Sequence, residues 1–327
     1  MSARTLSVIL PILFMAVGVA AYSCIIHSKW DEKPMPEYSK TDKERAAELT
    51  NVIEKLRPLH IKLGRPRRGD WLDRFDEAGQ TFRQYLRYGP ERPIGDRQII
   101  YIQPLGDFTV AQRKIVKLSA EFMGLYFDRP VKILKDLPLS VIPGKCRRLN
   151  GGKLQILTSY ILEYILPPRL PDDGAVCIAF TAIDLWPGKG WNFVFGQASL
   201  RERVGVWSIN RNGDPGASAA AYRLCLLRTI KTATHETGHM FSMHHCIKYE
   251  CNMCGSNHRE ESDRRPLACC PECAAKVCWA VRCDLIPRYK KLAAFCRENG
   301  LETEREFYNR SIKALKTVAK QERSSSE

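Results

Sequence analysis

The sequence contains no internal repeat and, apart from a short Ser-rich end, no low-complexity tract. With 327 residues, of which 44% are hydrophobic and 27% charged, it has the composition of a globular protein with a real core. The net charge is +15, but the Lys and Arg residues are scattered. The chain also lacks the aromatic interleaving of a single-strand binder and the pattern of a recognition helix. We therefore expect no specific nucleic-acid partner.

One long apolar run, residues 6–26, lies near the N-terminus. Its length is in the range of roughly 20 residues that span a bilayer. A cleavable signal peptide has a shorter apolar core followed by small residues, which Gly18, Ala20 and Ala21 would supply. We expect residues 1–27 to be an uncleaved signal-anchor that makes the protein a single-pass, membrane-associated one. Secretion after cleavage is the alternative.

From about residue 97 the chain alternates short apolar strands with amphipathic helices, so it combines α and β structure. We expect a linker and helix over 28–59, one large domain over 60–285, and C-terminal helices with a disordered tail over 286–327. The expected helices cover 41–56 (capped by Thr41), 111–127, 154–165, 217–241 (capped by Asp214), 285–297 and 302–319. The expected strands cover 98–102 (ended by Pro104 and Gly106), 131–134, 175–185, 191–195 and 204–209. Residues 246–283 show no clear helix or strand periodicity, so we expect a loop held by metal.

The segment His235-Glu236-Thr237-Gly238-His239 places two histidines four residues apart. On a helix such positions lie one above the other, so both imidazoles reach a common point. Glu236 lies beside that point and can take a proton from water there. His245, just past the helix, adds a third neutral ligand and leaves one zinc position open, as a catalytic site requires. The spacing predicts a catalytic zinc held by His235, His239 and His245, with Glu236 as the base.

Most of the cysteines follow this segment in the sequence: nine of the 13 fall within residues 246–296. An odd count, with pairs spaced C-x-x-C, favours metal ligation, and a disulfide framework is the alternative. Between Cys24 and Cys146 there is no cysteine, which excludes a pro-segment thiol in that stretch that would cap the metal.

The third histidine and the downstream Met253 resemble the metzincins, whose motif is H-E-x-x-H-x-x-G-x-x-H followed by a Met-turn. The segments 245–246, 251–253 and Cys270-Pro271-Glu272-Cys273 are more closely similar to the archaemetzincins. So are Gly69-Asp70-Trp71-Leu72, Tyr101-Ile102-Gln103-Pro104, Asp184-Leu185 and the run over 191–199. The resemblance covers about residues 60–285.

This resemblance implies an α+β, metzincin-like fold with a small twisted mixed sheet, a long active-site helix and a Cys-rich C-terminal subdomain held by zinc. It implies a second, structural zinc bound by Cys246, Cys251, Cys270 and Cys273, so that the protein holds two Zn²⁺. Cys254 could replace Cys251, and Cys269 adjoins Cys270. It also implies that residues 191–199 include the edge strand of the sheet, along which an extended peptide would bind.

The chain departs from the metzincin pattern at Ser242, where the pattern has glycine. The backbone turns sharply there towards the third ligand, so we expect a positive φ and a strain of about 1 kcal/mol for serine. Zinc binding contributes about 10 kcal/mol or more in small structural sites, so the ligands should still assemble. A shifted turn would make His244 the alternative third ligand.

Two functions fit these observations. The first is a zinc peptidase that hydrolyses peptide or protein substrates, in one form an aminopeptidase acting on short peptides. The second is a scaffold in which both zincs are structural and the partner is nucleic acid or an anionic membrane. Glu236 favours the peptidase, because a scaffold has no use for a carboxylate beside the metal. The sequence leaves the oligomeric state open.

Overall fold

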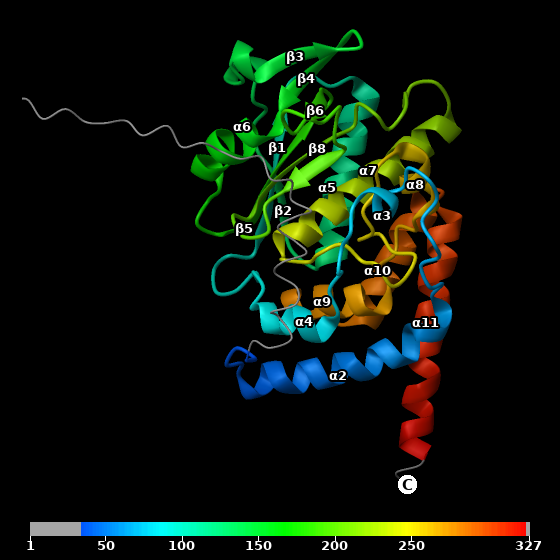
Figure 1. The fold of residues 1–327 in the computed structure, drawn as a ribbon. Helices are drawn as coiled ribbons and strands as arrows, with labels where there is room; N and C mark the ends of the chain where they lie inside the picture. Colours follow the sequence, from blue (N-terminus) through cyan, green and yellow to red (C-terminus); the bar gives the residue numbers. More distant parts are fainter. Residues whose placement is uncertain (1–33, 325–327) are drawn as a thin grey trace, which may run out of the picture.

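The computed structural model of the protein describes residues 34–324 (Figure 1). The apolar run over 6–26 lies outside these residues, so the membrane anchor stays a prediction. Between residues 34 and 324, none of the helices combines the length and the apolar character needed to cross a membrane.

Strands within residues 34–324 form two mixed sheets, as predicted for the α+β class. The larger sheet has the order β2-β1-β5-β8-β7, with parallel pairs except for β7, which runs antiparallel to β8 at one edge. The smaller sheet has the order β3-β4-β6. The strands are β1 (Ile99–Leu105), β2 (Val131–Ile133), β3 (Arg147–Asn150), β4 (Lys153–Leu157), β5 (Gly174–Thr181), β6 (Asp184–Trp186), β7 (Gly196–Ala198) and β8 (Val204–Ser208).

The long helices lie to the right of these sheets and below them in Figure 1. The α-helices are α2 (Lys40–Leu56), α3 (Trp71–Arg74), α4 (Phe82–Tyr88), α5 (Val110–Phe127), α6 (Thr158–Tyr160), α7 (Ala219–Met240), α8 (Arg259–Arg264), α9 (Pro271–Val281), α10 (Leu285–Glu298) and α11 (Glu302–Ser324). The shorter helices are η1 (Arg57–Leu59), η2 (Leu139–Val141), η3 (Gly144–Cys146), η5 (Pro167–Arg169) and the π-helix η4 (Ile161–Ile165).

The larger sheet is buried on both faces, and its side chains alternate between two hydrophobic clusters. Ile178 and Phe180 of β5 point to the helical side, where α5 and α7 pack against each other. Cys177 and Ala179 point to the opposite side, towards the smaller sheet and η4. This packing presses the predicted active-site helix, α7, against β7 and β8.

The N-terminal helix and the two C-terminal helices contribute to the same core as the active-site helix. Leu49 of α2, Phe295 of α10 and Tyr308 of α11 all belong to the hydrophobic cluster that contains Ile230 of α7. In Figure 1, α2 passes beneath α4 and α9, and it contacts both α9 and α11. Residues flanking the predicted domain over 60–285 are therefore packed onto it.

Both predicted helix caps are wrong. Helix α2 begins at Lys40, and Ser39 caps it by accepting a hydrogen bond from the backbone N–H of Asp42. Helix α7 begins at Ala219 with Ser218 as its cap. Asp214 instead accepts a hydrogen bond from the N–H of Gly216, so its carboxylate stabilises the preceding turn.

Two predicted strand boundaries are also wrong. Strand β1 continues past Pro104 to Leu105, because the Pro104 carbonyl faces Leu137. In a parallel strand the N–H points to the same side as the carbonyl of that residue, so the proline removes no bond to β5. The predicted strand over 175–185 is two strands in different sheets, since Thr181 accepts from the N–H of Ile183 and turns the chain between them.

The predicted helix over 154–165 begins as strand β4 and becomes helical only at Thr158. Gly151 and Gly152, both with positive φ, form the two-residue turn of a β3–β4 hairpin. The predicted strand over 191–195 is mostly irregular, with one bridge between Val194 and Leu185.

The Cys-rich region over 246–283, predicted to be a loop, contains the helices α8 and α9. Cys270 caps α9 and Pro271 occupies its first turn. Helix α9 is buried on nearly all sides, so its sequence lacks the alternation of polar and apolar faces by which an amphipathic helix is recognised.

Candidate active site

The three predicted zinc-binding histidines lie together at the end of α7. The Nε2 atoms of His235 and His239 are 3.0 Å apart, as expected for positions i and i+4 of one helix. The His245 ring centroid lies 5.3 Å and 4.9 Å from those two rings. The ring of His244 packs instead against Tyr88. One nitrogen from each of the three comes within 4.8 Å of the others, which is close enough to share a metal ion.

Each of the three imidazoles directs Nδ1 to an oxygen acceptor. The pairs are His235 with the Asn252 carbonyl (2.7 Å), His239 with the Met243 carbonyl (2.7 Å) and His245 with the Glu77 carboxylate (2.9 and 3.0 Å). A proton on Nδ1 leaves the Nε2 lone pair free for a metal. Burial, followed by the proximity of His245, lowers the pKa of His235 to about 3, so this imidazole is neutral. The donor set therefore fits zinc.

Glu236 is buried beside the histidines, against the edge strand. A Cβ atom added to Gly196 of β7 would lie 2.6 Å from the Glu236 Oε1 atom, so only glycine leaves room for this carboxylate. Burial raises the pKa of Glu236 to about 8. A carboxylate with a pKa near neutrality is suited to both taking and returning a proton.

Ser242 forms the turn that leads from α7 to His245. Its φ is +63°, which confirms the left-handed conformation expected where the metzincin pattern has glycine. The side chain is fully buried. Its hydroxyl donates to the Leu200 carbonyl (2.9 Å) and accepts from the Glu91 N–H (3.0 Å). Two hydrogen bonds thus offset the backbone strain and tie the turn to the segment after β7 and to the segment between α4 and β1.

Met253, the counterpart of the metzincin Met-turn residue, packs against the end of α7 that carries His235 and His239. Its sulfur would lie 2.7 Å from a Cβ atom added to Gly238, which stands between the two helical histidines. The backbone carbonyl of Met253 accepts from the N–H of Cys246. Met253 therefore joins the floor of the three-histidine site to the cysteine cluster.

The structure also brings together the four predicted cysteines. The Sγ atoms of Cys246, Cys251, Cys270 and Cys273 are buried and lie within 4.8 Å of one another. Cys251 Sγ accepts hydrogen bonds from the N–H groups of Met253 and Cys270, and such bonds stabilise thiolates.

The two alternative cysteines point to other partners. The Cys254 thiol donates to the Tyr249 carbonyl (3.2 Å), and the Cys269 sulfur accepts from the Tyr126 hydroxyl (2.9 Å). The four grouped thiols, without these two, have the composition of a closed structural zinc site.

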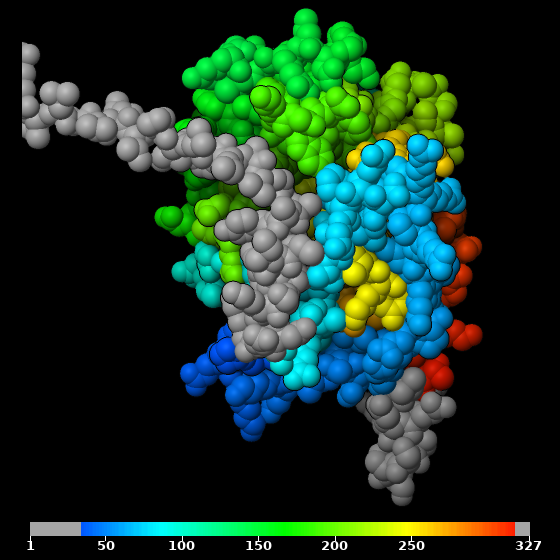
Figure 2. Space-filling model, viewed as in Figure 1, coloured from blue at the N-terminus to red at the C-terminus, as the bar shows by residue number. Residues whose placement is uncertain are grey.

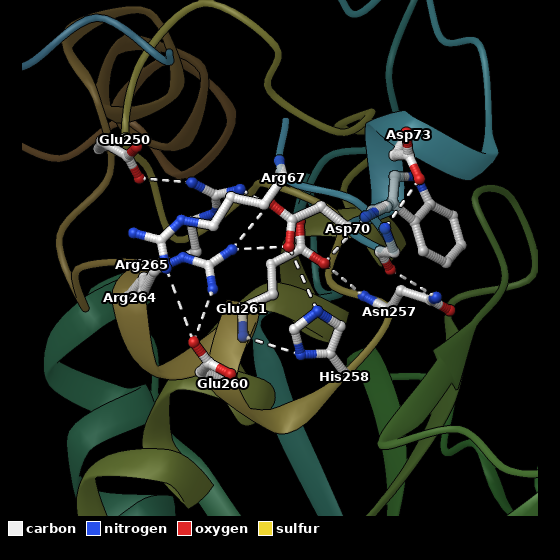
Figure 3. Close-up of polar contacts among 12 residues, drawn as sticks. Arg67, Asp70, Asp73, Glu250, Asn257, His258, Glu260, Glu261, Arg264 and Arg265 are labelled. Carbon is white, nitrogen blue, oxygen red and sulfur yellow. Dashed lines mark hydrogen bonds and ion pairs between the residues drawn. The ribbon is translucent and has the colours of Figure 1, made fainter. Parts of the chain in front are cut away.

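Sequence reasoning missed Glu77, although residues 69–72 of the same segment resemble the archaemetzincins. Figure 2 shows the blue-to-cyan segment before β1 framing the yellow loop that follows α7. The polar contacts that hold one end of this segment are drawn in Figure 3. The Asp70 carboxylate accepts two hydrogen bonds from Arg264 (2.6 and 2.8 Å) and contacts His258 (3.2 Å).

Asp70, His258 and Glu261 also lie within 4.8 Å of one another, as metal ligands would. The oxygen atoms of both carboxylates are already engaged, however. Arg264 pairs with Asp70, and Glu261 accepts from the N–H of Trp71 (2.9 Å) and from Arg265 (3.1 Å). This group is therefore a structural latch (Figure 3).

Three imidazoles around one point, a buried carboxylate beside them and an adjacent sheet edge define a site of the zinc metallopeptidase class. Residues 174–278 match the family described as "Peptidase family M54". Archaemetzincin-2 from Rattus norvegicus is 34% identical in an alignment of length 304, which covers 81% of this chain and 84% of that protein. Archaemetzincin from Archaeoglobus fulgidus is 33% identical over 178 residues, which are 54% of this chain and 98% of that protein. The chain belongs to the archaemetzincins, a family of zinc metallopeptidases.

A solved structure is similar as well. The crystal structure of archaemetzincin from Archaeoglobus fulgidus covers 54% of this chain and 99% of its own, with 31% sequence identity and a TM-score of 0.44.

Proposed function

We propose that this protein hydrolyses peptide bonds with one zinc held by His235, His239 and His245 and with Glu236 as general base. When bound, the zinc supplies a Lewis acid that activates water and polarises the scissile carbonyl. Glu236 takes the proton of the attacking water and passes it to the leaving amine. The observation that carries this proposal is the position of Glu236, buried on the helix turn of the two histidines with a pKa raised to about 8 by burial.

The second zinc is assigned to Cys246, Cys251, Cys270 and Cys273, with a structural role. These four thiols hold the loop after His245 against the start of α9. Zinc there would stabilise the loop that carries the third histidine and Met253.

Short peptides are the substrates that the sheet edge favours. Strand β7 spans three residues and ends the five-stranded sheet, so it offers few backbone groups to an added strand. Free-amine and N-acetylated peptides of increasing length, with products identified by mass spectrometry, would distinguish aminopeptidase from endopeptidase activity.

The decisive experiment compares Glu236→Ala with the native chain, both loaded with zinc and incubated with a mixed peptide library. We expect cleavage to fall by about 100-fold or more while zinc content is unchanged. Glu260→Ala, which removes an exposed glutamate of α8, is the matched control and should cleave normally. Full activity in Glu236→Ala would refute the mechanism. Salt-sensitive binding of RNA or anionic vesicles without any cleavage by the native chain would favour a scaffold instead.

A further inference from the structure

Residues 67–81, which we call the strap, cross the loop that carries His245 (Figure 2). At one end of the strap, Asp70 forms the two hydrogen bonds with Arg264 shown in Figure 3. At the other end, the Gln80 side chain donates to the Ser242 carbonyl (3.3 Å) and accepts from the His244 N–H (3.2 Å). The strap is thus tied to the structure on both sides of the third histidine.

Between these ties, the strap brings Glu77 and Trp71 to His245. Both oxygens of Glu77 lie within hydrogen-bond distance of His245 Nδ1, at 2.9 and 3.0 Å. The side chains of this pair are only 12% and 17% exposed, so water competes little for the contact. The Trp71 ring meets the His245 ring edge-on, with centroids 5.1 Å apart.

The other two zinc-binding histidines do not depend on an acceptor from the strap. His235 and His239 lie on α7, and the carbonyls that orient them belong to the loop over 243–252. His245 follows the strained turn at Ser242, outside any helix. Its acceptor comes from a residue 168 positions earlier in the chain.

We propose that Glu77 is a positioning residue for zinc binding: it holds His245 in the ligating orientation and tautomer from outside the three-histidine motif. The inference rests on the proposed catalytic zinc. A carboxylate that accepts from Nδ1–H keeps Nε2 directed at the metal and makes the imidazole a better donor. Glu77 itself does not reach the reacting atoms in this arrangement, because its carboxylate is turned to the far nitrogen of the ring.

The test measures zinc affinity at the three-histidine site in Glu77→Ala and Glu77→Gln, by competition with a chelator in the full chain. Removing such an outer carboxylate typically lowers metal affinity by about 10- to 100-fold. We expect a loss of that size in Glu77→Ala and a smaller one in Glu77→Gln, whose amide oxygen can still accept from Nδ1–H. The four-cysteine zinc should stay bound in both variants. Glu260→Gln, which removes an exposed acid near the latch, is the control and should bind both zincs normally.

A zinc affinity in Glu77→Ala equal to that of the native chain would overturn the inference, whatever happens to peptide cleavage. Should Glu77→Ala not fold, Glu77→Gln decides, and native affinity in that variant together with a native cobalt spectrum counts against the proposal. Failure of the proposed function has a different signature. In that case Glu236→Ala keeps its activity, while the loss of zinc affinity in Glu77→Ala persists.

Discussion

Replacement of Ser242 separates backbone strain from side-chain hydrogen bonding in the turn before His245. In Ser242→Ala the φ of +63° remains, and both hydrogen bonds of the hydroxyl are lost. A typical net hydrogen bond contributes about 1 kcal/mol, so we expect this variant to be destabilised by about 2 kcal/mol.

Ser242→Gly loses the same two hydrogen bonds but also relieves the left-handed strain. That strain is worth about 1 kcal/mol, so the glycine variant should be destabilised by only about 1 kcal/mol. It should therefore be more stable than the alanine variant by about 1 kcal/mol.

Urea-unfolding midpoints of the three proteins at one buffered zinc concentration would measure these differences, because bound metal stabilises the folded state by mass action. Equal stability of the alanine and glycine variants would refute the strain argument. A glycine variant more stable than the native chain would show that the two hydrogen bonds contribute less than the strain costs.

Two further substitutions test the site and the helix that carries it. Gly196→Ala should lower the rate of peptide cleavage by about 100-fold or more at unchanged zinc content, because the new Cβ would displace the Glu236 carboxylate; a native rate would contradict the placement of that group. Lys231 is buried, and burial lowers its pKa from the ordinary 10.5 to about 8. Between these two values the unfolded chain binds more protons, so native stability should rise with pH from about 8 to 10.5, by about 3 kcal/mol at most. Lys231→Met should lack this rise in urea-unfolding measurements across that range, and an unchanged slope would refute the assignment.

The local parts of the structure were predictable from the sequence. Helix periodicity located α5 and α7 within a few residues. The i, i+4 spacing of His235 and His239 requires only one helix, so their convergence follows from local geometry. The left-handed turn at Ser242 was predicted from the resemblance, because the metzincin motif has glycine where the backbone leaves the helix.

Other local patterns were present but were interpreted wrongly. The Gly151-Gly152 pair after Asn150 is typical of a two-residue hairpin, yet the apolar residues after it suggested a helix. In the same way, Cys and Ala side chains that face the core on all sides of α9 removed the polar face by which a helix is usually found.

The sequence by itself determined which residue types could hold zinc and which of them stand at ligand spacing. Tertiary structure alone decided which oxygen orients each imidazole. Glu77 lies 168 residues before His245, in a strap with little regular structure, and no periodicity links the two. They meet because the latch at Asp70 and the hydrogen bonds of Gln80 hold the strap across the turn. Such contacts depend on how separate segments pack, and packing is a property of the whole fold.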